Sequence, residues 1–282
     1  MNAPVVDAHV HFWDPRRLRH PWLDDLPALN RPFLPEDFRV ASATANVAKL
    51  VFVECGCDSL QGYQEMKWVE ELAQHEPRLK AIVVHASLEQ GCLARRQLES
   101  LVRSPLVRGV RRLLQSESDP EFCLRPGFVA GVQLLGGFGL SFDLCIRHEQ
   151  LPSVTELARR CPQVCMVLDH LGKPGIKKRE FQPWAQHFKE LAALPNVWCK
   201  ISGLTTEADI TSWKPEDLRP YLEHAFECFG FDRVMFGGDW PVSTLATSYE
   251  RWLETVSAAA ASASEAERRQ LFQENAERFY RV

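Results

Sequence analysis

The sequence has no hydrophobic run long enough to cross a membrane and no cluster of basic residues. Its formal net charge over 282 residues is −4, so a nucleic acid is not an expected partner. The first apolar stretch starts at Val5, which leaves little room for a signal peptide. We therefore expect a cytoplasmic protein with neither a membrane nor a nucleic-acid partner. A homo-oligomer is compatible with these features.

The nine cysteines are odd in number and include no CxxC pair. Cys145, Cys165 and Cys199 lie in apolar runs, where a thiol behaves as a small hydrophobic side chain. Cys55 and Cys57 alternate at the end of another apolar run and could act as paired metal ligands. Buried, reduced thiols are the commoner arrangement in a large cytosolic protein, and we favour that interpretation.

Short apolar runs alternate with segments of helical period along the whole chain. Strands that alternate with helices predict parallel strands, and eight such units in a chain of this length predict an α/β fold of the (β/α)₈ TIM-barrel type, formed as a single domain over residues 1–282. A doubly wound open sheet is the alternative, but no GxGxxG sequence follows the first strand. The predicted strands are residues 5–12, 49–55, 79–86, 106–114, 140–146, 163–170, 196–203 and 233–239, and the clearest helical segments are residues 62–77, 152–162 and 181–195.

No linker, repeat or low-complexity stretch marks a second domain. The longest irregular segment, residues 14–38, follows the first strand and contains several prolines and Trp22. Because barrel active sites lie at the carboxyl ends of the strands, we expect this long loop to cover that mouth of the barrel. Near the other end of the chain, Ser264 and Glu267 have the spacing of a helix capping box.

Polar residues gather at the ends of otherwise apolar strands. Asp7, His9 and His11 alternate in the first strand, so we expect them to share one face. Ionisable side chains in such places are unfavourable unless they meet partners or a ligand, and convergence from eight strands predicts a site. The polar residues at the later strand ends are Glu54, His85, Arg111, Arg112, Asp143, Arg147, His148, Asp169, His170, Lys173, Lys200, Ser202 and Asp239.

Each of these residues also has a purely structural interpretation. His170 could be a hydrogen-bonded core histidine, and Asp239 could cap the turn that follows it. Glu54 could pair with an arginine. Arg111 and Arg112 point to opposite faces of a strand, so only one of them can enter the barrel.

Several short sequence motifs resemble those of a known family. They are VDAHVHFWDP, HPWL, RGVRRLLQ, LDHLGKP, KISGL and MFGGDWPV, in that order between residue 5 and about residue 245. Together they resemble the amidohydrolase superfamily, and within it the sugar-acid lactonase branch of the amidohydrolase-2 family. L-fuconolactonases, L-rhamnonolactonases and pyrone-dicarboxylate lactonases belong to that branch.

The resemblance implies a hydrolase with at most one divalent metal. His9, His11, His170 and Asp239 match the ligand positions, and Glu54 could join them. The metal would be Zn²⁺ or Mn²⁺, which accept imidazole and carboxylate ligands. Strand four departs from two-metal members of the superfamily, since arginine stands where they have a carboxylated lysine and a guanidinium cannot bind metal. A metal-free mechanism, in which imidazoles and an arginine polarise the carbonyl, stays open.

The implied reaction is hydrolysis of a small aldonic lactone such as an L-fucono- or L-rhamnonolactone. Asp239 would take a proton from water and return it to the tethered leaving oxygen, with His170 as a second catalytic residue. We expect Glu54 to repel a dicarboxylate and so to favour sugar lactones. The expected substrate-binding residues are Glu54, His85, Arg111, Arg112, Lys173, Lys200, Trp13 and Trp240, with Trp22 from the loop.

Two other functions remain open. The same His and Asp set occurs in enzymes that resemble this one but decarboxylate small aromatic or enoic acids without oxidation. A sugar-acid-binding protein without catalytic activity is the third possibility.

Overall fold

The computed structural model describes residues 3–282, and its eight strands are all parallel and paired in chain order. The sheet curls back on itself, because the Asp239 amide donates to the His9 carbonyl oxygen and the His11 amide donates to the Trp240 carbonyl oxygen, both at 2.8 Å. The predicted (β/α)₈ barrel is confirmed. The strands are β1 (Val5–Val10), β2 (Val47–Val53), β3 (Leu79–His85), β4 (Val107–Arg111), β5 (Ser141–Leu144), β6 (Met166–Leu168), β7 (Val197–Ile201) and β8 (Val234–Phe236).

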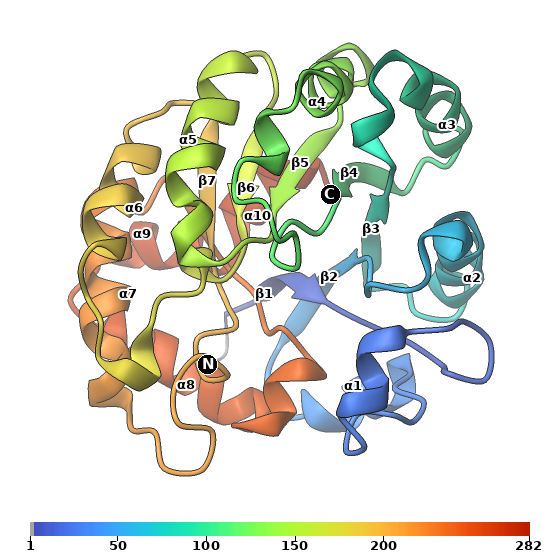
Figure 1. Ribbon diagram of the computed structural model, residues 1–282. Coiled ribbons are helices and arrows are strands. Elements are labelled where there is room, and N and C mark those ends of the chain that lie inside the picture. The colour runs from blue at the N-terminus through green and yellow to red at the C-terminus, as the bar shows by residue number, and fades with distance from the viewer. Residues whose placement is uncertain (1–2) are drawn as a thin grey trace.

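Helices surround the strands (Figure 1). No helix within residues 3–282 combines the length and apolar character needed to span a membrane. The predicted capping box forms, since the Ser264 hydroxyl accepts from the Glu267 amide at the start of α9. The helices are α1 (Pro35–Ala41), α2 (Gly62–Ala73), α3 (Ala94–Leu101), α4 (Pro126–Phe138), α5 (Leu151–Arg160), α6 (Trp184–Ala192), α7 (Pro215–Phe229), α8 (Tyr249–Ala259), α9 (Glu265–Arg269) and α10 (Asn275–Tyr280).

Two hydrophobic layers hold the barrel together. The layer between strands and helices is large and rich in Leu, Ile and Phe. The layer inside the barrel is built mainly from short or β-branched side chains, which fit the limited space there. Its buried members are Val6, Ala8, Val51, Val53, Ala81, Val83, Val167 and Met235, joined by Ala276, Phe279 and Tyr280 from α10.

Helix α10 therefore packs into the amino end of the barrel, opposite the predicted active-site mouth. Figure 1 places it, in red, behind the strands near the centre of the view. An ion pair of 2.7 Å between Lys49 Nζ and Glu277 Oε1 ties this helix to β2.

The segment after β1 covers the carboxyl end of the barrel, as expected. Trp13 pairs with Phe33 across the base of the loop, and the Trp22 indole donates to the Cys55 carbonyl oxygen at 2.8 Å. The irregular part ends earlier than the expected residue 38, because α1 begins at Pro35. The Asp37 carboxylate caps that helix by accepting from the Leu34 amide.

The expected common face of Asp7, His9 and His11 is wrong. The pairing register of β1 with β2 slips by one residue between Asp7 and Val10, which is the mark of a β-bulge. Ala8 lies in the inner layer and His9 contacts residues inside the barrel, whereas the Asp7 carboxylate points outward to Tyr249 on α8. One extra residue in the strand thus turns Asp7 away from the two histidines.

Candidate active site

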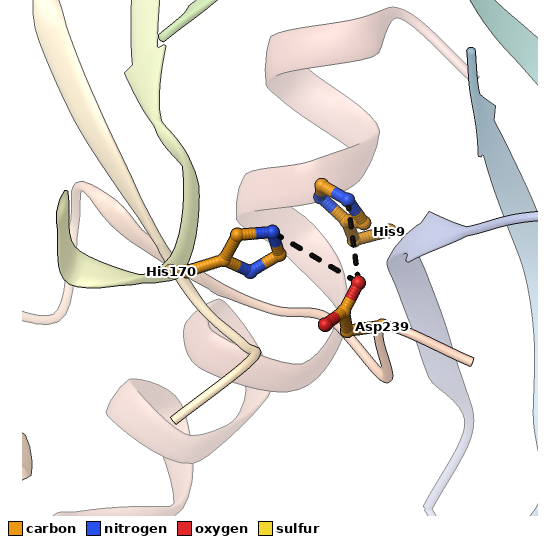
Figure 2. A group of neighbouring side chains, drawn as sticks. All are labelled: His9, His170 and Asp239. Atoms are coloured by element: carbon orange, nitrogen blue, oxygen red, sulfur yellow. Dashed lines mark ion pairs between the residues drawn. The ribbon is translucent and has the colours of Figure 1, made fainter. Parts of the chain in front are cut away.

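Four side chains from three parts of the barrel meet at its carboxyl end. His9 lies in β1, His11 directly follows β1, His170 follows β6, and Asp239 follows β8. The Asp239 Oδ1 atom lies 3.5 Å from His11 Nε2, 3.7 Å from His9 Nε2 and 3.9 Å from His170 Nε2. Figure 2 shows His9 and His170 pointing toward this carboxylate from opposite elements.

The backbone around His170 is unusual. His170 and Leu171 both have positive φ, and Gly203 packs against the imidazole ring. A Cβ atom at Gly203 would lie 2.3 Å from His170 Nδ1, and Gly203 itself has a φ of +64°. Only glycine meets both conditions, so this residue allows His170 to reach the site.

The second ring nitrogen of His11 and that of His170 each contact a neighbouring oxygen atom. His11 Nδ1 lies 2.7 Å from the Val53 carbonyl oxygen, and His170 Nδ1 lies 2.9 Å from Ser202 Oγ. Such contacts fix ring orientation and are typical of histidines that bind metal or catalyse proton transfer.

Burial sets the charge state of the site. Desolvation lowers the pKa of His170 to about 4 and lowers that of His9 as well. Burial alone would raise the pKa of Asp239, but the neighbouring His170 and the hydrogen bond from His11 outweigh it and hold that pKa below its usual value. At neutral pH the site therefore presents an ionised Asp239 and neutral rings at His9 and His170.

A buried ionic network lies directly beneath. Arg111 Nε donates to Glu54 Oε1 at 2.7 Å, and Arg111 Nη1 donates to Asp169 Oδ2 at 3.1 Å. Lys200 Nζ lies 3.1 Å from Asp169 Oδ1 and 2.5 Å from Asp143 Oδ2. Positive and negative groups thus alternate through the barrel, so no member is buried without a counter-charge.

A cavity of about 570 Å³ opens above these residues. Its floor is formed by His11, Arg111, His170 and Asp239. Its apolar lining comes largely from the loop after β1, and its polar lining includes hydroxyl, amide and ammonium groups. The apolar residues are Trp13, Pro21, Trp22, Leu26, Leu113 and Val242, and the polar ones include Gln115, Ser116, Lys173 and Thr206.

Among the expected substrate-binding residues, only Arg111, Lys173 and Trp13, with Trp22, line this cavity. The other five were also expected to contact the substrate, but none of them lines the cavity. Arg112 turns outward and pairs with Glu89 and Glu117. His85 packs against Gly62, where a Cβ atom would lie 3.1 Å away.

Trp240 packs edge-on against Phe33 and Phe38 beneath the loop, and Lys200 is fully buried in the ionic network.

Glu54 needs a separate correction, because it was expected as a possible metal ligand too. Its Oε1 accepts from Arg111 and its Oε2 accepts from the Gly56 amide at 2.8 Å. Both oxygens are therefore occupied, and the charge is neutralised by Arg111. The expectation that Glu54 repels a dicarboxylate is wrong for the same reason.

The remaining donors fit one divalent metal. The ligand atoms of His9, His170 and Asp239 all lie within 4.8 Å of one another, and His11 Nε2 is 3.2 Å from His9 Nε2. Imidazole nitrogens with one ionised carboxylate form a suitable ligand set for Zn²⁺. Cys55, which was considered as a metal ligand together with Cys57, donates its thiol hydrogen to the Phe12 carbonyl oxygen. All nine cysteines are unpaired.

Three contributors, Gln115, Ser116 and Tyr280, were not among the expected site residues. Gln115 and Ser116 line the cavity beyond β4, where Gln115 ends the stretch RGVRRLLQ, but no feature of the sequence marked either as a site residue. Tyr280 reaches the ionic network from α10, where its hydroxyl donates to Asp143 Oδ2 at 2.9 Å. Asp143 and Lys200 are charged residues within the apolar stretches FDLC and WCKI, so the sequence indicated that both need partners. Nothing in the sequence indicated that Tyr280 is one of them.

Comparison with known proteins identifies the family. The family model described as "Amidohydrolase" matches residues 6–282. A protein of Burkholderia multivorans named L-fucono-1,5-lactonase is 35% identical over 285 residues, covering 93% of each chain. One of Burkholderia ambifaria with the same name is 34% identical and covers 88% of this chain and 85% of its own.

A crystal structure of an amidohydrolase from Burkholderia multivorans with bound zinc is 34% identical. It superposes with a TM-score of 0.89 and covers 99% of this chain and 100% of its own. The expected hydrolase family is confirmed: this chain belongs to the amidohydrolases.

Proposed function

We propose that this protein hydrolyses a small sugar-acid lactone, such as an L-fucono- or L-rhamnonolactone. The observation that carries the proposal is the ionised Asp239, set among three imidazoles that include the cavity-lining His11 and His170. The names of the two Burkholderia relatives support the same reaction class.

Asp239 is suited to act as the base. Its side chain lines the cavity, and its backbone amide donates to the His9 carbonyl oxygen. A water molecule between Asp239 and the bound lactone would give up a proton to Asp239 as it attacks the carbonyl carbon. The ring-opening oxygen stays tethered to the same molecule, so Asp239 can return the proton to it.

The carbonyl oxygen gains negative charge as water attacks. Arg111 and His170 both line the cavity floor, where they can stabilise that charge as hydrogen-bond donors. If a Zn²⁺ or Mn²⁺ ion is bound, His9, His11, His170 and Asp239 would hold it, and it would polarise the carbonyl and lower the pKa of a bound water.

The charge balance of the cavity favours a polyhydroxylated ring over a dicarboxylate. Its two cations are both paired, since Arg111 contacts Glu54 and Asp169 and Lys173 lies 3.8 Å from Glu207. A second carboxylate would find no uncompensated cation among the lining residues that the structure describes. Hydroxyl groups can instead bond to Gln115, Ser116 and Thr206.

The test is acid release, followed with a pH indicator, from fucono-, rhamnono-, galactono- and arabinonolactones and from a pyrone dicarboxylate, each with and without chelator. Asp239→Asn should lower kcat by at least about 10²-fold, the usual contribution of a positioned acid or base. The exposed Asp25→Asn is the matched control and should leave the rate unchanged.

Loss of turnover with binding retained in Asp239→Asn would support an enzyme. No acid release from any lactone would contradict the proposal. Carbon dioxide release from an aromatic or enoic acid would then identify a decarboxylase, and lactone binding without turnover a binding protein.

The cytoplasm is the compartment that we propose, because nine unpaired thiols suit a reducing environment.

A further inference from the structure

A second cavity lies directly beside the active-site cavity, and we call it the side cavity. Its volume is about 370 Å³, and it is lined by the loops that follow β5, β6 and β7 at the carboxyl end of the barrel. Lys173 and Thr206 line both cavities and so form part of the boundary between them. Arg147 of the side cavity donates from Nε to the carbonyl oxygen of Gln115, which lines the active-site cavity, at 3.3 Å.

The side cavity is lined by more cations than carboxylates. The cationic side chains are those of Arg147, Lys173, Lys177 and Lys178, and the carboxylates are those of Glu149, Glu180 and Glu207. His148 is the remaining ionisable residue of the lining, and the excess of positive charge is present even when this ring is neutral. A concave surface with an excess of one charge attracts ligands of the opposite charge, so the side cavity favours an anion.

Three of the cations are available to a ligand. Arg147, Lys177 and Lys178 form no ion pair within residues 3–282, and all three are exposed to solvent. Arg147 follows β5 and the two lysines follow β6, so they come from two different loops. Donors that converge on one cavity from separate loops are typical of a binding site for a polar ligand.

The fourth cation lies at the boundary of the two cavities. Lys173 Nζ is 3.8 Å from Glu207 Oε1, which is too far for a hydrogen bond, and the two side chains are 20% and 23% exposed. Lys173 has a φ of 55°, and backbone strain of this kind is typical of functional sites. The ammonium therefore has donor capacity that Glu207 does not use, next to both cavities.

The proposed reaction changes the charge of the bound molecule. Hydrolysis adds one water to a neutral lactone, and the hydroxy acid that forms loses a proton to solvent at neutral pH and becomes a carboxylate. This anion forms beside Asp239, which lines the same cavity and is ionised again once it has returned its proton to the ring oxygen. The two like charges repel each other, so the active-site cavity holds the product less favourably than the lactone.

We propose that the side cavity is a subsite for the carboxylate of the ring-opened product, in which Arg147, Lys177 and Lys178 bind the anion after it leaves Asp239. Lys173 is placed to contact the anion in either cavity. The identity of the ligand rests on the lactonase proposal above, whereas binding of a small carboxylate in the side cavity does not require turnover.

The test uses L-fuconate, the acid formed from L-fuconolactone, and L-fucitol, which carries a CH₂OH group in place of the carboxylate. In the double variant Lys177→Glu/Lys178→Glu, calorimetry should show the Kd for L-fuconate raised by about tenfold, since each exposed cation contributes modestly and its reversal adds repulsion. High salt should reduce this difference, because exposed charges are screened. L-fucitol has no charge and should show no such difference.

Product inhibition is the second readout. The inhibition constant of L-fuconate in the double variant should also rise by about tenfold, and the KM of the neutral lactone should rise far less. An equal rise of the two constants would indicate a disturbed active site and contradict the proposal. Arg147→Gln lies in a different loop and should raise the Kd for L-fuconate in the same direction, which protects the test if the double variant folds poorly.

Lys80→Glu/Arg96→Glu is the matched control. Both residues are exposed and neither lines either cavity, so this double variant changes the net charge by the same amount away from the proposed subsite. Its Kd for L-fuconate should equal that of the unmodified protein.

An unchanged Kd for L-fuconate in both Lys177→Glu/Lys178→Glu and Arg147→Gln overturns the proposal, and so does an equal rise in the control. Weaker binding of inorganic phosphate without weaker binding of L-fuconate also overturns it, since the side cavity would then serve another anion. If the unmodified protein hydrolyses no lactone but the differences in Kd are found, the proposed function fails and the side cavity is still a carboxylate site.

Discussion

The barrel contains two buried tyrosine–aspartate hydrogen bonds, and they differ in the residues that surround them. Tyr249 donates to Asp7 and Tyr280 donates to Asp143, in both cases at 2.9 Å. Asp7 lies on the outer side of β1, where its other donors are the amides of His9 and Gly238. Asp143 lies inside the barrel against a lysine.

The counter-charge makes the difference. Burial raises the pKa of Asp7 to about 7, because only neutral donors face it. Burial also raises the pKa of Asp143, but the Lys200 ammonium opposes the rise and the value stays at about 6. The Asp7 pair joins the β1 backbone to the turn after β8 and to α8, whereas the Asp143 pair belongs to an ionic network that ends at His9. The same bond therefore lies in a neutral setting in one place and in a charged network next to the candidate active site in the other.

The largest difference should appear when the counter-charge is removed. Lys200→Met leaves Asp143 and Asp169 without their shared cation, and breaking a buried pair in this way typically costs about 3–5 kcal/mol. Urea unfolding followed by circular dichroism measures the loss. Lys49→Met, at a half-buried ion pair with Glu277, should cost less than about 1 kcal/mol. Equal losses in the two variants would contradict the assigned role of the network.

Stability should depend on pH through Asp7. A carboxyl group whose pKa rises from 3.8 to about 7 on folding binds more protons in the folded state, so its contribution to stability falls as pH rises between these values. From pH 4 to pH 7 the free energy of unfolding of the natural protein should fall, relative to Asp7→Asn, by on the order of 3 kcal/mol. Urea unfolding at several pH values tests this. A constant difference between the two proteins would show that Asp7 does not titrate in this range.

The smallest effect should follow removal of the outer phenol. Tyr249→Phe takes one of three donors from Asp7 and should lower the free energy of unfolding by about 1–3 kcal/mol. Its kcat should stay within twofold, since the backbone amides of His9 and Gly238 still hold the carboxylate. Thermal unfolding and steady-state kinetics measure both. A loss of kcat beyond twofold would show that the Asp7 pair also affects the active site.

Much of the fold could be read from local sequence. The eight strands follow apolar, largely β-branched runs, and polar residues at their carboxyl ends predicted the convergence of His9, His11, His170 and Asp239. The opposite directions of Arg111 and Arg112 follow from simple alternation along a strand.

The parts that could not be predicted depend on contacts between distant residues. Glu54 at a strand end has the same appearance whether it meets substrate or an arginine, and only the packed structure shows both of its oxygens occupied. Tyr280 lies in a short helix far along the chain from Asp143, and no spacing rule connects them. The β-bulge in β1 is set by backbone pairing, which leaves no signature in side-chain type.

That bulge places a constraint on chain length. Residues 7 to 11 deliver one carboxylate outward and two imidazoles inward only because the strand carries one residue more than its neighbour between Asp7 and Val10. Inserting a further residue next to Ala8 would move Asp7 out of register with Gly238 and Tyr249, or the histidines out of register with Asp239. In this stretch, the number of residues between functional groups matters as much as their identity.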